Sequence, residues 1–270
     1  MKNLQPVHFE LVNNLPLFDV KINGESRKFI LDSGSSYMVL SSKYEDDDSM
    51  PVPSNAGSDG MNILRAKPIS SVVWGELSLS NQIAMISDIS HLEEKLNVKV
   101  HGLIGCAQFM NYDLLLDYRK LIVTLIDSYG ETPDCMKDAL SIPFIMSDHI
   151  PVVPVKIGSR ALSMGLDTGA SHNVIEKEHK QYLEKIEALF DVTDDVLLRF
   201  EKENTEQGVT LCSVNSVKIG DSLTVDGMRF YFHDINIPNV KANGLLGFEL
   251  FNKQKALIRF NKRVLLLQDY

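Results

Sequence analysis

The sequence predicts an all-β chain built as two similar lobes related by a pseudo-twofold axis, with few helices. Many short segments alternate apolar and polar residues between Gly and Asn turns, which is typical of β-barrels and β-sandwiches. An Asp-Ser/Thr-Gly turn that follows an apolar strand occurs twice, at Asp32 and at Asp167, which lie 135 residues apart (167 − 32) in a chain of 270. A Gly-apolar-apolar-Gly segment also occurs twice, at 102–105 and 244–247. These features indicate that one β unit is present in two copies.

The duplication can be followed when the chain is compared with itself at a shift of 135 positions. Identical residues then coincide at Met1 and Met136, Lys2 and Lys137, Phe9 and Phe144, Pro16 and Pro151, Leu31-Asp32 and Leu166-Asp167, Gly34 and Gly169, and Ser36 and Ser171. Further along, the shift becomes 142, which places His101–Gly105 on Asn243–Gly247. We therefore predict an N-terminal lobe at 1–130, a linker at 131–138 and a C-terminal lobe at 139–270, each of a common domain size.

The strands are expected in the same order in both halves. A hairpin around Asn23-Gly24, the strongest short turn signal in the chain, connects strands at 16–22 and 28–31, and Gly158-Ser159 occupies the corresponding turn of the second half. Alternating apolar residues also predict strands around 7–11 and 142–146. The other predicted strands are 72–74, 77–79, 83–86, 114–116, 121–126, 256–260 and 264–267.

One clear helix is predicted, from Glu176 to Phe190, because Leu183, Ile186 and Phe190 share a helical face. The corresponding place in the first half holds the acidic run 45–48, which lacks the alternating ligands and loop glycine of a calcium site and is interpreted as a solvated turn. Trp74, the only tryptophan, is expected in the core.

The composition argues against a nucleic-acid partner, a disulfide framework and a zinc site. Hydrophobic content of 44% and charged content of 23% indicate an ordinary globular protein. The formal net charge of −9 disfavours a nucleic-acid partner, because phosphate neutralisation requires clustered Lys and Arg. Cys106, Cys135 and Cys212 are odd in number and lack CxxC spacing, so we expect buried reduced thiols rather than a disulfide framework or a zinc site.

The segment 1–7 contains no apolar run that could serve as a signal-peptide core, and the chain has no stretch of about 18 apolar residues to span a membrane. We expect a cytoplasmic protein without a membrane partner, or an exported one if a signal has been trimmed from this sequence.

The repeated Asp turns suggest a specific chemistry. A carboxylate at the end of a strand can point into a groove between lobes, and the following Gly lets backbone N–H groups approach it. Two carboxylates about 3 Å apart cannot both ionise, so they share one proton. The ionised member can then act as general base on a water molecule while the protonated member polarises a substrate carbonyl. Such a site cleaves peptide bonds without a metal or any other cofactor.

With these motifs in place, the chain resembles the aspartic proteases of the retropepsin and pepsin kind, specifically bacterial retropepsin-like domains fused in tandem. The resemblance rests on Asp32-Ser33-Gly34-Ser35 and Asp167-Thr168-Gly169-Ala170, together with Leu103-Ile104-Gly105 and Leu245-Leu246-Gly247. It spans nearly the whole chain and implies two acid-protease β-barrel lobes with the active site between them.

The resemblance also implies a role for each residue. Asp32 and Asp167 would be the catalytic pair, Ser33 and Thr168 would form a hydroxyl grip between the lobes, and Gly34 and Gly169 would lie under the water site. Ser35 can hydrogen-bond the outer oxygen of Asp32, whereas Ala170 cannot do so for Asp167. The two apolar-apolar-Gly segments would pack behind the loops.

Enzymes of this kind close a flap over the substrate. The candidate in the first half is 54–60, and its tip would be Gly57, Ser58, Asp59 and Gly60, without the tyrosine of pepsin-like flaps. The candidate in the second half is 201–208, which is more charged and poorer in glycine.

One alternative concerns metal binding. His172, Glu176 and His179 have helix-compatible spacing, but an i,i+7 histidine pair does not match the i,i+4 zinc pattern, so an exposed helix face is favoured and no metal is expected.

The leading function is an aspartic endopeptidase that acts on a peptide or protein substrate. Its alternative is a catalytically silent module of the same fold that binds a peptide or a partner, which the presence of both aspartates disfavours. A carbohydrate or small-ligand binder has no support in the sequence. Because both half-sites are in one chain, we expect a monomer.

Overall fold

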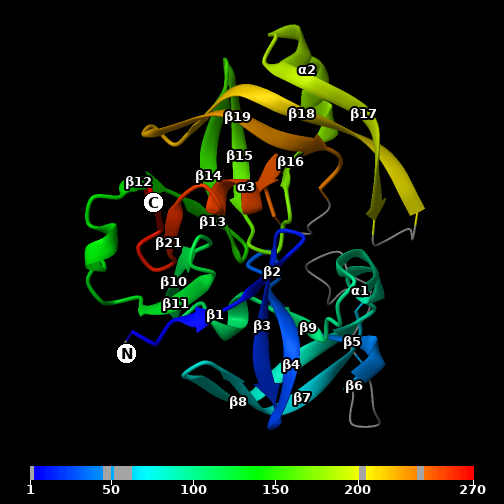
Figure 1. Cartoon of the computed structure of the whole chain (residues 1–270), viewed down its shortest axis with the longest axis vertical. Helices are drawn as coiled ribbons and strands as arrows, with labels where there is room; N and C mark the ends of the chain where they lie inside the picture. Colours follow the sequence, from blue (N-terminus) through cyan, green and yellow to red (C-terminus); the bar gives the residue numbers. More distant parts are fainter. Residues whose placement is uncertain (1–2, 45–49, 52–62, 201–204, 236–239) are drawn as a thin grey trace.

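The computed structural model describes residues 3–44, 50–51, 63–200, 205–235 and 240–270 (Figure 1). The chain is 55% strand and 12% helix and contains two closed six-stranded barrels, as the sequence predicts. Its strands form three sheets: one eight-stranded sheet in each lobe and a six-stranded sheet that contains strands from both halves. Within the described residues, no helix is both long enough and apolar enough to cross a lipid bilayer.

The first barrel forms from the N-terminal half. Its six strands, in hydrogen-bonded order, are β3 (Leu15–Ile22), β4 (Glu25–Leu31), β9 (Gly102–Ile104), β5 (Met38–Ser41), β8 (Leu77–Ser87) and β7 (Ile63–Trp74), and β7 pairs again with β3. The short strands β2 (Glu10–Val12) and β6 (Met50–Pro51) extend the two ends of this sheet. The predicted hairpin turn is present: Asn23 and Gly24 have φ of 50° and 89°, the left-handed values that a tight two-residue hairpin turn requires.

The second barrel repeats this order. Its strands are β14 (Ile150–Ile157), β15 (Arg160–Leu166), β20 (Gly244–Leu246), β16 (Asn173–Ile175), β19 (Leu223–Phe232) and β18 (Thr205–Ile219), which pairs again with β14, while β13 (Ile145–Ser147) and β17 (Leu189–Phe200) extend the ends. The registers also correspond. Phe29 is opposite Gly102 in the parallel pair β4–β9, and their counterparts Met164 and Gly244 are opposite each other in β15–β20. The duplication seen in the sequence is therefore a duplication of strand pairing.

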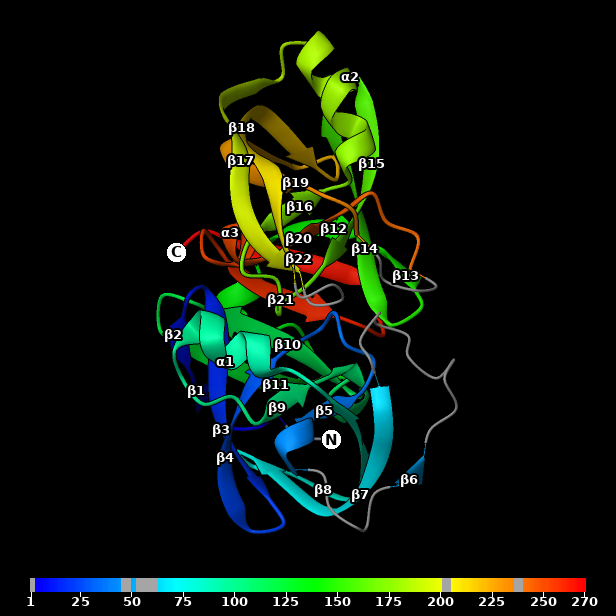
Figure 2. The same ribbon diagram turned by 90° about the vertical axis from the view of Figure 1, so that its right-hand side faces the viewer.

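The third sheet lies between the two barrels (Figure 2). Its strands are β1 (Val7–His8), β11 (Ile122–Asp127), β10 (Tyr112–Asp117), β21 (Lys255–Arg259), β22 (Val264–Gln268) and β12 (Leu140–Pro143). The halves meet where β10 pairs antiparallel with β21, with Leu115 opposite Leu257. These two leucines correspond under the shift of 142, so the pseudo-twofold axis passes through this pair.

Helices are few, but the predicted helix at 176–190 is wrong in extent. The structure has a 3-10 turn, η4 (Lys177–His179), followed by the short α2 (Lys180–Lys185), and Phe190 already belongs to β17. Glu187 has a left-handed φ of 54°, and this turn ends the helix and redirects the chain into the strand.

The remaining helical elements are short, and none was predicted. They are η1 (Ser42–Tyr44), α1 (Ser90–Leu96), η2 (Cys106–Gln108), η3 (Asp134–Met136) and α3 (Phe248–Phe251).

Three of the predicted strand segments belong to two much longer strands. The segment 72–74 is the end of the twelve-residue β7, and 77–79 with 83–86 form the single strand β8. The polar residues Ser80, Asn81 and Gln82 interrupt the apolar alternation, yet the strand continues through them because Ser80 pairs with Ser71 and Gln82 with Ile69 of β7. The acidic run 45–48 lies outside the described residues.

The core is continuous through both barrels and the sheet between them. Trp74 is 1% exposed and packs edge-on against Phe18 with ring centroids 5.2 Å apart, which confirms its predicted core position. Cys106 and Cys212 are buried, and burial raises the pKa of the Cys212 thiol to about 12. Cys135 is exposed, so the prediction of buried thiols is wrong at this position.

A buried ion pair connects the halves beside the central sheet. Arg259 of β21 is 1% exposed and its Nε donates to Asp113 Oδ2 of β10 at 2.7 Å. The other Asp113 oxygen accepts from Phe260 N at 3.1 Å. Arg259 also donates to Thr132 Oγ1 at 3.0 Å and to the Gly130 carbonyl at 2.9 Å. Each charge is thus neutralised or hydrogen-bonded, which a buried ion pair requires.

We expect Asp113→Ala to lower the free energy of unfolding by about 3–5 kcal/mol, because it leaves the Arg259 guanidinium buried without its counter-ion. Asp113→Asn retains an acceptor for Phe260 N and should cost less. Urea denaturation of both variants measures this difference. Equal midpoints for Asp113→Ala and the unmodified protein would show that the pair does not contribute to stability.

Candidate active site

The two Asp turns meet between the barrels, each at the end of an equivalent strand. Asp32 follows β4, and its N–H donates to the Ile104 carbonyl at 3.0 Å. Asp167 follows β15, and its N–H donates to the Leu246 carbonyl at 3.0 Å. The first two residues of each apolar-apolar-Gly segment therefore belong to the parallel strand beside the aspartate. Their hydrogen bonds fix the position of each aspartate at the end of its barrel.

The two loops are joined by four hydrogen bonds between buried groups. Ser33 N–H donates to Thr168 Oγ1 at 3.0 Å, and Thr168 N–H donates to Ser33 Oγ at 2.9 Å. The same hydroxyls donate onward across the interface, Ser33 Oγ to the Leu166 carbonyl at 3.2 Å and Thr168 Oγ1 to the Leu31 carbonyl at 2.9 Å. Both residues are at most 1% exposed. The structure thus places Ser33 and Thr168 in the arrangement that the resemblance implied.

Backbone N–H groups position the carboxylates. Gly34 N–H donates to Asp32 Oδ1 at 2.8 Å and is also 3.1 Å from Asp167 Oδ1. Gly169 N–H donates to Asp167 Oδ1 at 2.8 Å. One amide therefore contacts both carboxylates, and the side chains of Asp32 and Asp167 also hydrogen-bond to each other. The structure brings the two predicted catalytic residues into direct contact.

Glycine is required beside both carboxylates. A Cβ atom at Gly34 would lie 2.6 Å from Asp167 Oδ2, and one at Gly169 would lie 2.5 Å from Asp32 Oδ1. These distances are shorter than real Cβ contacts, so any side chain would push the aspartate of the opposite lobe away.

Burial dominates the protonation of Asp167, which is 8% exposed. Desolvation raises the pKa of this carboxyl, and the bonds from Gly169 N–H, Asp32 and Gly34 N–H, together with the positive charge of His149, partly oppose that increase. A raised pKa for one member of a carboxyl pair favours the singly protonated state that general acid–base catalysis requires.

The glycines of the apolar-apolar-Gly segments lie directly behind the loops. A Cβ atom at Gly105 would lie 2.2 Å from the Tyr37 carbonyl, and one at Gly247 would lie 2.3 Å from the Ala170 carbonyl. The next residue of each segment holds the loop, because Cys106 N–H donates to the Ser35 carbonyl at 2.9 Å and Phe248 N–H to the Ala170 carbonyl at 3.0 Å. Leu103, Ile104, Leu245 and Leu246 are all buried.

The outer parts of the site are only partly described. Ser35 Oγ donates to the Tyr37 carbonyl at 2.9 Å, a bond within its own loop. The candidate flap tip, Gly57, Ser58, Asp59 and Gly60, lies outside the described residues. So do residues 201–204 of the second candidate, whereas 205–208 form the beginning of β18.

A polar cavity of about 330 Å³ lies beside the Asp167 loop, lined by residues of both lobes. Asn13, Asn14 and Lys95 contribute from the first lobe, and Ser171, His172, Arg229, Tyr231 and Glu249 from the second. Its lining includes the basic side chains of Lys95 and Arg229 and the acidic side chain of Glu249.

His149 is a site residue that the sequence analysis did not identify. It lies in the turn before β14, and its ring Nε2 is 2.7 Å from the Gly34 carbonyl. The signal was available, because a shift of 135 pairs His149 with Asn14, whose Nδ2 donates to the Ser171 carbonyl at 3.1 Å. Each lobe therefore places one polar side chain against the Asp loop of the other.

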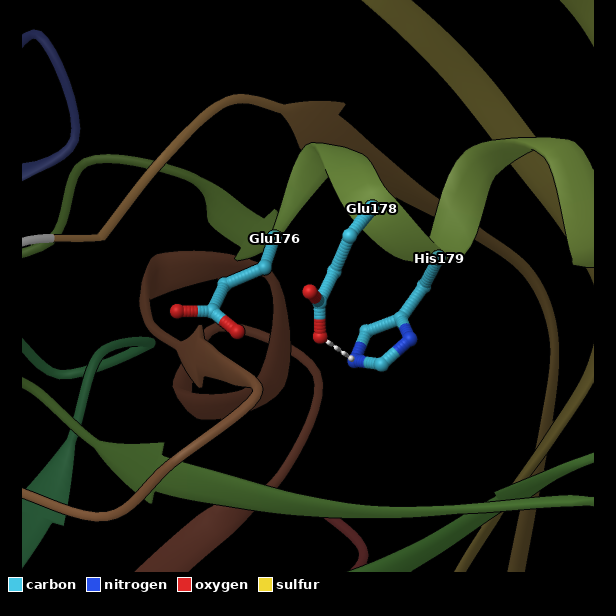
Figure 3. A group of neighbouring side chains, drawn as sticks. All are labelled: Glu176, Glu178 and His179. Carbon is cyan, nitrogen blue, oxygen red and sulfur yellow. Dashed lines mark ion pairs between the residues drawn. The ribbon is translucent and has the colours of Figure 1, made fainter.

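Glu176, Glu178 and His179 form a second cluster, in which one ligand atom of each lies within 4.8 Å of the others (Figure 3). Arg160 lies 3.0 Å from His179 Nδ1 and can only donate, so the neutral ring carries its proton on Nε2, which faces Glu178 Oε1 at 3.6 Å. A proton on Nε2 leaves no lone pair there for a metal ion, and this buried nitrogen has no hydrogen-bond partner among the described residues.

Neither histidine of this region lies on an exposed helix face, so that interpretation is wrong. His179 is 3% exposed. His172 packs against Tyr231 with ring centroids 4.3 Å apart, and burial lowers its pKa to about 3.

Comparison with known proteins agrees with this geometry. Residues 153–250 match the family model for aspartyl proteases, a range that includes the Asp167 loop and Gly244–Gly247. No curated protein matches the chain. The matched region and the two closed barrels together fit a two-lobed retropepsin-like aspartic protease fold. The first barrel has the same strand order as the matched one, which extends the likeness to the Asp32 loop.

We expect Ser33→Ala and Thr168→Ala each to lower the free energy of unfolding by about 1–3 kcal/mol, because each leaves a buried N–H of the other lobe without an acceptor. Thr168→Ser keeps the hydroxyl and is the matched control, with a smaller loss. Thermal unfolding of the three variants measures the effect. If Thr168→Ala and Thr168→Ser are equally stable, the methyl group rather than the hydrogen bond is responsible.

Proposed function

We propose that the protein is an aspartic endopeptidase that hydrolyses peptide bonds with a water molecule activated between Asp32 and Asp167. The observation that supports this most strongly is the shared contact at Gly34, whose N–H lies within hydrogen-bond distance of one oxygen of each carboxylate. Two carboxyl groups held so closely are stable only when they share a proton, and this state provides a base and an acid at once.

The reaction follows from that state. The ionised carboxylate accepts a proton from the water, whose oxygen attacks the peptide carbonyl, while the protonated carboxyl donates to the carbonyl oxygen. The carboxyl that took the proton from the water then gives it to the amide nitrogen as the C–N bond breaks. The other carboxylate recovers its proton from a hydroxyl of the tetrahedral carbon as the carbonyl re-forms. Backbone amides hold the aspartates throughout, so little reorganisation is needed during the reaction.

The substrate we propose is an extended peptide that lies between the lobes. The cavity that includes Ser171 and His172, which follow the Asp167 turn in the sequence, is lined by residues of both lobes. Binding there would place side chains of the peptide against polar groups while the scissile bond faces the carboxylates.

We expect Asp32→Asn and Asp167→Asn each to lower turnover by several orders of magnitude, because each amide removes the base or the shared proton. Both variants should remain folded, since asparagine has the shape of aspartate and relieves the repulsion of two carboxylates. Peptide cleavage followed by mass spectrometry, with thermal unfolding as a control, tests this. Ser80→Ala, at an exposed position of β8, should retain full activity.

If both variants cleave peptides at the rate of the unmodified protein, the activity does not come from this site. Peptide binding by an unmodified protein that never cleaves would instead support the alternative, a silent module of the same fold.

We also expect the active species to be a monomer, because the chain contributes both catalytic loops and both sides of the central sheet. Specific activity should then be constant as the protein is diluted, while sedimentation shows a single 30.3 kDa species. Activity that falls with dilution together with a dissociating dimer would contradict this expectation.

A further inference from the structure

The strand that follows each Asp turn is paired in the same way in both lobes. In the first lobe Met38 lies opposite Ala84 in the parallel pair of β5 with β8, and in the second lobe Asn173 lies opposite Phe230 in the parallel pair of β16 with β19. All four of these side chains are buried. Successive side chains of a strand point to opposite faces, so the residue before each of them faces away from the barrel core. Equivalent outward positions therefore follow both Asp turns.

The outward positions of the second lobe are polar or charged. They are His172, Arg229 and Tyr231, and all three line the cavity of about 330 Å³. Glu249 of α3 completes this side of the cavity, and Lys95 lines it from the first lobe. Charged groups of both lobes therefore face one space.

The outward positions of the first lobe are apolar or aromatic. Tyr37, Ile83, Met85 and Ala107 stand at the positions that correspond to His172, Arg229, Tyr231 and Glu249. Tyr37 is 43% exposed and Ile83 is 54% exposed. Two neighbouring apolar side chains at the surface offer a place where an apolar group of a ligand can be removed from water. The two sides of the molecule thus have the same backbone and opposite chemistry.

Cations outnumber anions in the cavity. Its cations are Lys95 and Arg229, and its anion is Glu249. Within the described part of the chain the guanidinium of Arg229 has no hydrogen-bond or ion-pair partner, so its N–H groups can bind a ligand. Burial, with the charges of Lys95 and His233, lowers the pKa of His172 to about 3, so this ring is neutral. A carboxylate is the group that a guanidinium binds best, through two parallel hydrogen bonds.

We propose that the two sides of the site select different side chains of one peptide substrate. The cavity of the second lobe binds an acidic side chain through Arg229 and Lys95, and the surface of Tyr37 and Ile83 in the first lobe binds an apolar one. This inference rests on the proposed peptidase function and adds the class of substrate to it. Positions related by the pseudo-twofold axis lie on opposite sides of that axis, and the two Asp loops meet on it. The acidic and the apolar side chain therefore lie on opposite sides of the cleaved bond.

One peptide can reach both surfaces. Tyr37 and His172 each follow their catalytic aspartate by five positions (37 − 32 and 172 − 167). Their Cα atoms therefore lie at most about 19 Å from that of the aspartate, a distance that about six extended residues cover. A peptide of about twelve residues spans both sides. A site with exact twofold symmetry would accept a peptide in either direction, whereas these unlike surfaces fix one direction.

The test uses a library of synthetic peptides of about twelve residues at about pH 6, where Asp and Glu side chains are ionised. Mass spectrometry identifies the cleaved bonds. We expect Asp or Glu on one side of the bond and a large apolar residue on the other, always in the same order.

Two substitutions test the two surfaces separately. Arg229→Ile gives the second lobe the residue that the first lobe has at Ile83, and it should lower the preference for acidic side chains about tenfold, equivalent to one charge-assisted hydrogen bond. Tyr37→Ser should lower the preference for apolar side chains and leave the acidic preference unchanged. Arg27→Ile, in β4 and outside both surfaces, is the matched loss of an arginine and should change neither preference.

Cleavage without an acidic preference, or with one that Arg229→Ile does not change, would overturn the proposal and leave the proposed function in place. A preference for basic side chains that Glu249→Gln removes would also overturn it, because the cavity would then bind a cation. Affinity selection of the same library by Asp32→Asn measures binding without cleavage. If the unmodified protein cleaves nothing but Asp32→Asn selects acidic peptides through Arg229, the proposed function fails and the charged cavity stands as a binding site. If peptides are neither cleaved nor selected, both fail.

Discussion

The hydrogen bonds between Ser33 and Thr168 are the constraint on which the rest of the structure depends. The two carboxylates come from separate barrels, and they can share a proton only if both lie at the same place between the barrels. These hydrogen bonds hold the two loops together there. Each hydroxyl accepts from the opposite backbone and donates to the carbonyl before the opposite aspartate. The register of β4 on β9, and of β15 on β20, sets the position of each Asp loop relative to its own barrel. The Leu115–Leu257 pair aligns the two halves about one axis.

The parts of this arrangement that depend on local sequence could be predicted. Asp-Ser/Thr-Gly and the apolar-apolar-Gly segments are short, and each requires glycine because a Cβ would meet a backbone carbonyl or a carboxylate. Their repetition at nearly constant spacing predicted both the duplication and the pairing of Asp32 with Asp167. The Asn23-Gly24 hairpin could be predicted for the same reason, since the left-handed turn depends on those two residues alone.

Other features depend on contacts that are distant in the sequence. The helix predicted to reach Phe190 ends because Glu187 adopts a left-handed conformation, and glutamate carries no signal for it. The strand β8 continues through Ser80, Asn81 and Gln82 because β7 pairs with it along its whole length, which alternation within β8 alone does not reveal. His149 was missed because its partner, Gly34, is in the other lobe, although its correspondence with Asn14 was present in the sequence.

Some of the differences between the halves lie beside the two aspartates. Two identical carboxylates would share their proton equally, whereas catalysis needs one acid and one base. The framework of the site is nearly symmetrical, because Asp32 and Asp167 have equivalent strands, equivalent glycines and equivalent supports from Cys106 and Phe248. The asymmetry comes from the residues around that framework: Ser35 against Ala170, and His149 against Asn14. The ring of His149 contacts the Gly34 carbonyl, whereas the amide of Asn14 contacts the Ser171 carbonyl, so the two loops are held at different points. Duplication in one chain makes this possible, since each half can change its outer contacts while the grip and the central sheet keep the two loops in register.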